Sequence, residues 1–480
     1  MRLSVLLLAA ALSGCGALVR TPPSPVPDVP REALGRPLAP ETLREDAAFL
    51  VRTLEEVHPD LYALTDSAAA RQRLDAVVAA LDRPMTRLGL WRRLAPWVAS
   101  LGDGHTGMRF PLPEYEAWRD GGGARFSLPV EVRGDTLRLA QEALGAAACS
   151  PLSSVNGRPA AEVVAETRAV VSGEREAYRD YQVGRSFAAW AWAAAGLEGP
   201  FTVAMASGDT LRFRGGVRDT AAAPEASARP PALLYERLPD GTGWLRAWTF
   251  SRPLAEYRAE LARVFAQIRA EGTERLLVDV RENGGGNSAL GDALLAHLTD
   301  RPWRTVARAE WKRSEQYGRH IKSHVAPAVR WAIPWAIVPE VGGYFRTPVG
   351  GTHVATFDEP VAPEAPEHRY SGEWAVLTGT RTFSSGTLFA LAVKDHGLAP
   401  IVGEETGGEA SGFGEVFTFA LPNSGLGVRV SSKRFVRPNG SVAPGGVVPD
   451  VPVAVRCGAS GDPVRARAVE VLRERLTAEG

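Results

Sequence analysis

Two strand–loop–helix units dominate the pattern of apolar and polar positions in the second half of the chain. In the first, an apolar strand at 276–278 is followed by a loop and a helix at about 289–298. In the second, a strand at 374–377 leads through a polar loop into a helix that ends at His396. Two such units predict an α/β fold, a mostly parallel sheet with covering helices. In such sheets the loops after the carboxyl ends of the strands carry the chemistry.

The first half of the chain predicts a different organisation. A capping box at Thr42 and Glu45 opens a helix that ends at His58, and a second amphipathic helix ends at Gly102. From about 126 to 214, short apolar runs alternate with turns, which predicts mixed β structure with one helix in its middle. We therefore expect five parts: an N-terminal helical region (42–115), an inserted small mixed-β domain (116–220), an α/β core (230–456), an insertion within that core (303–370), and a C-terminal helix (457–480).

The N-terminus predicts export. The apolar stretch Val5 to Leu12 follows Arg2 and is far shorter than the roughly 20 residues of a membrane span. Leu12-Ser13-Gly14-Cys15 resembles a bacterial lipobox, in which the cysteine becomes the lipidated first residue. We expect a lipoprotein signal peptide (1–15), a lipid anchor at Cys15, and a location in the bacterial cell envelope, facing the periplasm and, from Gly16, at the outer membrane. The alternative is an ordinary secretory signal with a chance cysteine.

Proline and cysteine usage fit an exported protein. Seven prolines among residues 21–40 predict an extended tether over 16–41 that holds the folded part away from a membrane. Cys149 and Cys457 would face an oxidising compartment and could pair there, although the sequence does not say whether they meet.

Charge and composition exclude other classes. The 480 residues include 55 Lys+Arg and 55 Asp+Glu, so no net positive field is available, and we expect no nucleic-acid partner. Hydrophobic residues make up 45% and charged residues 23%, as in an ordinary globular protein. The three cysteines are too few for a disulfide scaffold or a four-thiolate zinc site.

Three loops carry candidate chemistry, and each also has a plain structural explanation. The glycines 284–286 after the first strand can aim backbone N–H groups at developing negative charge, or form only a tight turn. Ser384 lies where a strand turns into a helix, where it can act as a nucleophile or only cap the helix. His105 can be a base or a turn histidine. His320 and His324 have metal-ligand spacing without a following carboxylate, so we interpret them as surface residues and expect no metal.

Taken in order, the motifs resemble one family. Leu101-Gly-Asp-Gly-His-Thr106, Val278-Asp-Val-Arg-Glu-Asn-Gly-Gly-Gly286, Thr382-Phe-Ser-Ser-Gly386, Ile401-Val-Gly-Glu-Glu-Thr-Gly-Gly408 and Gly446-Val-Val-Pro-Asp450 resemble the tail-specific (C-terminal-processing) serine peptidases. The resemblance covers about residues 42–456 and looks closest to the branch that contains the tricorn protease core. It implies a crotonase-like or ClpP-like core and a PDZ-like insert.

The resemblance also implies site residues. Ser384 precedes Gly403 by the 19 positions that the family pattern requires of the nucleophile. The lysine of the tail-specific branch is replaced by Glu409, so His105 is the expected base. We expect acyl transfer to peptide or unfolded-protein substrates through Ser384, without cofactor or metal. The expected oxyanion donors are the amides of Gly284, Gly285 and Ser385.

One position departs from the family pattern and keeps alternatives open. The glutamate expected three positions before Gly446 is Ala443, so either Glu409 orients His105 or Glu409 is a solvated loop acid. Asp395 is interpreted as structural. The alternative functions are a catalytically silent, lipid-anchored binding protein and an envelope module that presents its insert to partner proteins.

Overall fold

The computed structural model describes residues 22, 24–217, 231–338 and 341–479, which form four β-sheets with helices around them. The largest sheet has six strands in the order β17-β14-β13-β10-β9-β8. Its pairings are parallel except that of β8 with β9. The expected mostly parallel sheet applies only to this sheet, because the other three are antiparallel, and the fold as a whole is mixed α/β. The strands of the large sheet are β8 (Leu233–Arg237), β9 (Gly243–Ala247), β10 (Arg275–Asp279), β13 (Glu373–Thr378), β14 (Ile401–Gly403) and β17 (Val451–Pro452).

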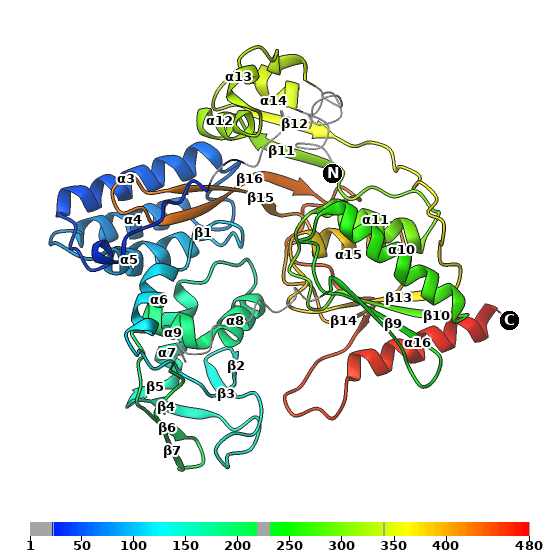
Figure 1. Ribbon diagram of the computed structural model, residues 1–480, viewed down its shortest axis with the longest axis horizontal. Coiled ribbons are helices and arrows are strands. Elements are labelled where there is room, and N and C mark those ends of the chain that lie inside the picture. Colours follow the sequence, from blue (N-terminus) through cyan, green and yellow to red (C-terminus); the bar gives the residue numbers. More distant parts are fainter. Residues whose placement is uncertain (1–21, 23, 218–230, 339–340, 480) are drawn as a thin grey trace.

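Helices cover both faces of this sheet (Figure 1). Leu276 and Val278 of β10 pack in one apolar cluster with α10 (Leu254–Ala270), α11 (Ser288–Leu298) and α15 (Ser385–Asp395). Leu277 points to the other face, where it packs with α16 (Pro463–Glu479). The uninterrupted apolar run at 276–278 follows from this burial on both sides.

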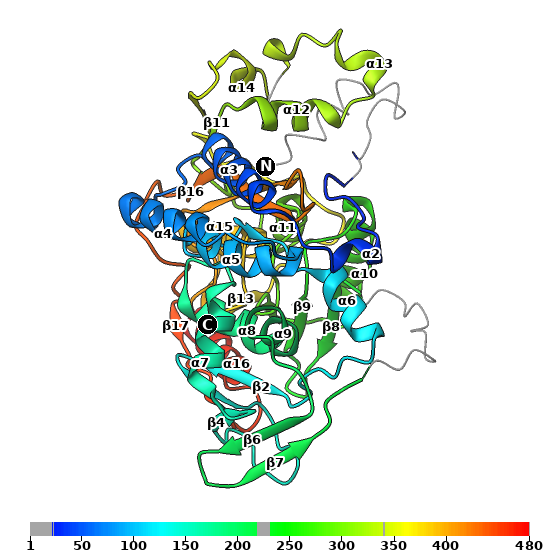
Figure 2. The ribbon, with the colours of Figure 1, turned by 90° about the vertical axis from the view of Figure 1, so that its left-hand side faces the viewer.

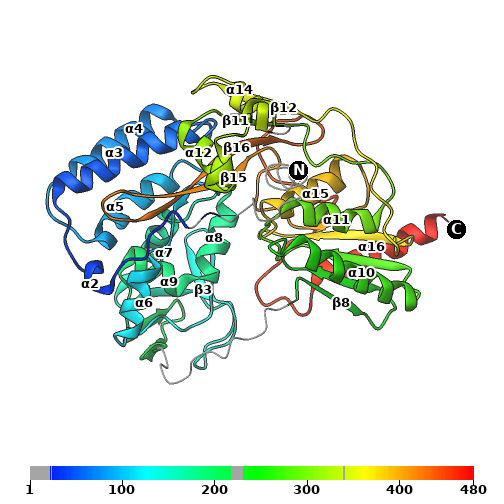
Figure 3. The ribbon, with the colours of Figure 1, turned by 45° about the horizontal axis from the view of Figure 1, so that its top comes forward.

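A second sheet, which the apolar pattern does not reveal, joins the N-terminal region to the core. Its five strands centre on β16, which pairs with β15 along one side and with β1 and β11 along the other. Figure 3 shows how this sheet spans the two halves of the molecule. Its strands are β1 (Gly107–Met108), β11 (Arg308–Lys312), β12 (Thr352–Thr356), β15 (Phe413–Ala420) and β16 (Gly427–Val436).

The insertion expected at 303–370 supplies β11 and β12 and stands above this sheet (Figure 1). Between these two strands lie α12 (Glu315–Ser323), α13 (Pro327–Arg330), η2 (Trp335–Ile337) and α14 (Gly342–Arg346).

The N-terminal region begins differently from the expectation. Its first long helix, α3 (Pro40–Val57), starts at Pro40 with Ala39 as an N-cap that makes no side-chain hydrogen bond, so the predicted capping box at Thr42 is wrong. Proline at the first helical position has no N–H to leave unsatisfied and a preset φ, which suits it to start a helix. The other helices are α2 (Arg31–Leu34), α4 (Ser67–Ala79) and α5 (Arg87–Ala99).

The second half of the expected tether packs against the body. Leu34 is buried, and Leu38 forms a β-bridge with Met85. Residues 31–41 are therefore not an extended spacer, because their apolar side chains find partners on the N-terminal helices. The signal peptide and Cys15 lie outside the described residues.

The insert is more helical than expected and lies below the N-terminal region (Figure 2). It contains three helices after its first strands rather than one, and a disulfide joins its Cys149 to Cys457 before α16. No described helix is long and apolar enough to cross a bilayer. The elements are α6 (Leu112–Asp120), β2 (Val130–Arg133), β3 (Thr136–Leu139), β4 (Leu152–Val155), β5 (Arg158–Pro159), α7 (Ala160–Ala169), α8 (Glu176–Arg185), α9 (Phe187–Ala195), β6 (Phe201–Met205) and β7 (Thr210–Phe213).

Candidate active site

A cleft of about 770 Å³ collects the candidate residues from distant parts of the chain. Ser384 and Ser385 enter it from the start of α15, Gly286 from the loop after β10, and His105 from the loop between α5 and β1. The fold therefore brings together the serine, glycine and histidine loops that the sequence singles out.

Ser384 occupies a backbone conformation that ordinary residues avoid. It is the N-cap of α15 with φ 54° and ψ −124°, and its side chain makes no cap hydrogen bond. Positive φ in a non-glycine residue costs about 1–3 kcal/mol and often marks functional sites. Ser385, in contrast, is buried, and its hydroxyl donates to the Gly286 carbonyl at 2.6 Å. Of the two serines, Ser384 is therefore the one whose hydroxyl neither caps the helix nor bonds to the glycine loop.

The glycine loop packs directly on Ser384. A Cβ at Gly285, which has φ +96°, would lie 2.6 Å from the Ser384 Cβ, so only glycine fits there. The buried Asn283 clamps the two loops together: its Oδ1 accepts the Gly285 amide at 2.9 Å, and its carbonyl accepts the Phe383 amide at 3.0 Å. The Gly285 amide already donates to Asn283, so the prediction that it is an oxyanion donor is wrong. Gly285 instead lets the glycine loop pack closely against Ser384.

His105 is enclosed but has no hydrogen-bond partner among the described residues. Both ring nitrogens are buried and unpaired, and the ring stacks on Phe383 with centroids 4.7 Å apart. Burial lowers the pKa of His105, and the neighbouring carboxylate of Asp103 opposes that shift. His105 is therefore favoured as a neutral imidazole, the form that a general base requires.

Asp103 anchors the histidine loop. Its Oδ2 accepts hydrogen bonds from His58 Nε2 at 3.1 Å and from the hydroxyls of Thr106 and Ser431 at 2.5 Å, and its Oδ1 accepts the His105 amide at 2.9 Å. The pKa of this buried carboxyl lies well below its usual range, because the hydrogen bond from His58 and the charge of that ring outweigh desolvation. Asp103 Oδ1 lies 4.0 Å from His105 Nδ1, beyond hydrogen-bond distance.

Glu174, which the sequence analysis did not single out, lies against the same loop. Its Oε1 accepts the Gly104 amide at 3.0 Å, while its Oε2 is buried without a partner. Burial and the charge of Asp103 raise the pKa of Glu174 to about 8. No spacing rule could have found it, because the contact joins the insert to a loop 70 positions away.

The other positions at which the family pattern places an acid have separate roles. Glu409 lines the cleft, but its Oε2 accepts the Gly445 amide at 2.6 Å, and burial raises its pKa. Ala443 is exposed, so it contributes nothing to the cleft. Asp395 accepts hydrogen bonds from Arg437 and Asn439, which agrees with a structural role.

Helix α12 forms a wall of the cleft. His320 and His324 both line it and are half-buried, so they are cleft residues rather than freely exposed ones. Burial and His324 lower the pKa of His320 to about 4. Tyr317 donates a hydrogen bond to Glu415 of β15, which holds the wall against the sheet.

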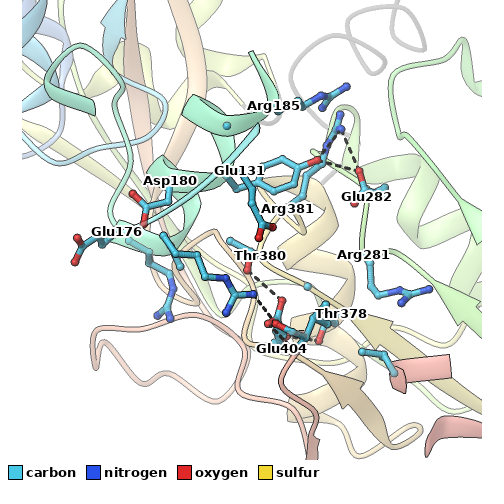
Figure 4. Close-up of a pocket in the computed structure, with 18 of the residues that line it drawn as sticks. Glu131, Glu176, Asp180, Arg185, Arg281, Glu282, Thr378, Thr380, Arg381 and Glu404 are labelled. Atoms are coloured by element: carbon cyan, nitrogen blue, oxygen red, sulfur yellow. Dashed lines mark hydrogen bonds and ion pairs between the residues drawn. The ribbon is translucent and has the colours of Figure 1, made fainter. Parts of the chain in front are cut away.

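A larger cavity of about 1330 Å³ adjoins the cleft and lies between the insert and the six-stranded sheet. Figure 4 shows its charged lining, in which Arg381 donates a hydrogen bond to Glu282 and Thr380 donates one to Glu404. Glu174 and Glu409 line both hollows, so these two side chains lie where the hollows adjoin.

The histidine loop and Glu174 of the insert together provide the one set of possible metal ligands found among the described residues. Asp103, His105 and Glu174 each place a ligand atom within 4.8 Å of the others. Four protein donors already occupy the oxygens of Asp103, which leaves it a poor third ligand.

Comparison with known proteins shows which family model and which solved structures the chain resembles. Residues 241–453 match peptidase family S41. No curated protein matches the chain in sequence. Solved structures with a similar fold include a mutant of CPAF (17% identity, TM-score 0.63, covering 90% of this chain and 96% of that chain) and mature CPAF complexed with lactacystin (18%, 0.58, 91% and 97%). A putative peptidase from Parabacteroides merdae is similar at 16% identity and a TM-score of 0.48, covering 91% of this chain and 97% of that chain.

The matched residues 241–453 carry the glycine loop and Ser384, so the candidate site lies within the segment that is similar to peptidase family S41. This family is one of serine peptidases, and its substrates are peptides or proteins. The likeness to CPAF establishes that the shared fold extends over the N-terminal region and insert as well.

Proposed function

We propose that the protein is a serine endopeptidase that cleaves peptide bonds through a Ser384 acyl-enzyme, with His105 as general base. The observation that carries this proposal is the strained backbone of Ser384, held by Gly285 in a cleft that His105 also lines. Strain of this kind needs support from its surroundings, and here Asn283 supplies it through both loops.

The proposed reaction begins with proton transfer from the Ser384 hydroxyl to His105 as the serine oxygen attacks the peptide carbonyl. Negative charge then develops on the carbonyl oxygen. The Ser385 amide is one donor for it, since the first N–H groups of a helix have no partner within the helix. Gly286 is the proposed second donor because its carbonyl is fixed by Ser385 and its amide donates to none of the described residues. His105 then protonates the leaving amine, and water releases the acyl group.

Peptide hydrolysis by the purified protein tests this proposal. We expect wild-type protein to cleave an unfolded protein substrate, and both Ser384→Ala and His105→Ala to lose cleavage by at least about a hundredfold. A Ser385→Ala control should fold and retain activity, with a lower kcat because the Gly286 carbonyl loses its donor. Cleavage that survives in Ser384→Ala contradicts the mechanism, and no cleavage by folded wild type moves the silent binding protein to first place.

We also propose that the protein is exported and lipid-anchored at Cys15, on the periplasmic side of the outer membrane. The Cys149–Cys457 disulfide supports export, because such bonds persist in oxidising compartments. Membrane fractionation of wild type and Cys15→Ala tests the anchor: we expect the variant to leave the membrane fraction. The PDZ-like character of the insert, and its recognition of substrate ends, stay predictions.

A further inference from the structure

The imidazole of His105 needs an acid partner, and the structure does not supply one where the family pattern expects it. Ala443 stands in the expected place and is exposed. Glu409 makes its short hydrogen bond to the Gly445 amide instead. Asp103 is close, but its oxygens already accept four hydrogen bonds, and its Oδ1 is 4.0 Å from His105 Nδ1.

Glu174 is the remaining carboxyl beside this ring, and it has an unused oxygen. Its Oε2 is buried without a partner, as are both ring nitrogens of His105. One atom of each of Glu174, His105 and Asp103 lies within 4.8 Å of the others. A buried polar atom without a partner destabilises the fold, so a small rotation that pairs the carboxyl with the ring is favourable.

The local backbone is shaped for this approach. Gly104 carries no side chain, and a Cβ there would lie 2.8 Å from Glu174 Oε2 and 2.8 Å from Phe383 Cζ. Its amide holds the other oxygen of Glu174 at 3.0 Å. Phe383 stacks on His105 on one side and on Tyr178 of α8 on the other, with centroids 4.7 and 4.4 Å apart. Phe383 of the serine loop is therefore sandwiched between His105 and Tyr178 of the insert.

We infer that Glu174 is the positioning residue of His105: its carboxylate accepts the imidazole N–H, sets the tautomer, and stabilises the imidazolium that forms when Ser384 is deprotonated. The inference rests on the proposed Ser384–His105 mechanism. It makes the insert a part of the active centre.

The charge state of Glu174 gives the inference a pH signature. The pKa of Glu174 is about 8, so the carboxylate forms, and the base is oriented, as pH rises through this value. Of the other groups that face the pair, the pKa of Asp103 is lowered and that of Tyr178 is raised to about 12. Burial raises the pKa of Glu409 and lowers that of Arg429, so the loss of the inflection in Glu174→Gln is what assigns it to Glu174.

The test is the rate of Ser384 labelling by a fluorophosphonate, measured from pH 6 to 10 on the purified full chain. For wild type we expect the rate to rise with an inflection near pH 8. Glu174→Gln keeps an oxygen for the Gly104 amide but cannot ionise, so we expect the inflection to vanish and the rate at pH 9 to fall at least about tenfold. Glu174→Asp should restore the inflection at a lower rate.

Glu162→Gln is the matched control, because Glu162 is an exposed residue on α7 of the same insert. It should retain the wild-type profile. A Glu174→Gln variant that keeps the inflection overturns the inference, whether its rate is unchanged or uniformly lowered, since a structural role lowers the rate at every pH. Absence of labelling in folded wild type overturns the proposed function and this inference together.

Discussion

At the scale of single residues, the site depends on buried polar groups whose partners come from distant segments. Asp103 receives donors from His58 at the end of α3, from its own loop, and from Ser431 on β16. A buried carboxylate is stable only with such full hydrogen bonding. Sequence spacing identifies the Asp-Gly-His loop, but it cannot reveal these donors.

Asp103→Asn tests this anchor. The amide keeps the size but loses the charge that His58 and the two hydroxyls bind, so we expect the free energy of unfolding to fall by about 3–5 kcal/mol at pH 7. Because the folded-state pKa of Asp103 is lowered, its contribution is present above pH 3.9 and is lost as pH falls through the folded value. The difference in urea stability between variant and wild type should therefore shrink at acid pH; a constant difference contradicts the account.

At the scale of elements, the glycine loop and the start of α15 act as one unit. Gly285 and Gly286 have positive φ and tight neighbours: a Cβ at Gly286 would lie 2.3 Å from the Phe250 carbonyl oxygen. Gly284 has no such contact, since its nearest neighbour would be Arg381 Nε at 3.9 Å.

Alanine at each glycine separates these roles. We expect Gly285→Ala to lower the free energy of unfolding by about 2–4 kcal/mol, because it combines overpacking with an unfavourable φ. Gly284→Ala is the control and should be stable to within about 1 kcal/mol. Thermal unfolding of both variants checks this, and equal midpoints contradict the packing described.

The sequence predicts elements well where their periodicity is local. The strand at 276–278, the helix at about 289–298 and the serine helix follow from apolar spacing and are confirmed. The antiparallel sheet around β16 could not be predicted, because its strands come from three separate segments and pair only in the folded chain. Likewise, the position of His320 in the cleft depends on long-range contacts of α12 with that sheet, such as the Tyr317–Glu415 hydrogen bond.

At the scale of the whole molecule, the insert contacts both the histidine loop of the N-terminal region and the α/β core. Glu174 touches the histidine loop, and the Cys149–Cys457 disulfide ties the insert to the segment before α16. The larger cavity lies between these parts, so their relative position sets its width.

Removing the disulfide tests this arrangement. A Cys149→Ser, Cys457→Ser double variant leaves no unpaired thiol of this pair, and we expect the free energy of unfolding to fall by about 2–4 kcal/mol. The Glu174 contact persists without it, so the pH profile of Ser384 labelling should keep its inflection. The readouts are urea unfolding under non-reducing conditions and the labelling profile; unchanged stability contradicts the role of the disulfide.

The most direct test of the central claim is to map the fluorophosphonate adduct by tandem mass spectrometry on wild-type protein, Ser384→Ala and His105→Ala. The account predicts a single adduct on Ser384, absent from both variants, with Ser385 unmodified because its hydroxyl is bound to Gly286. An adduct on Ser385, or labelling of Ser384 that does not require His105, would contradict the Ser384–His105 mechanism.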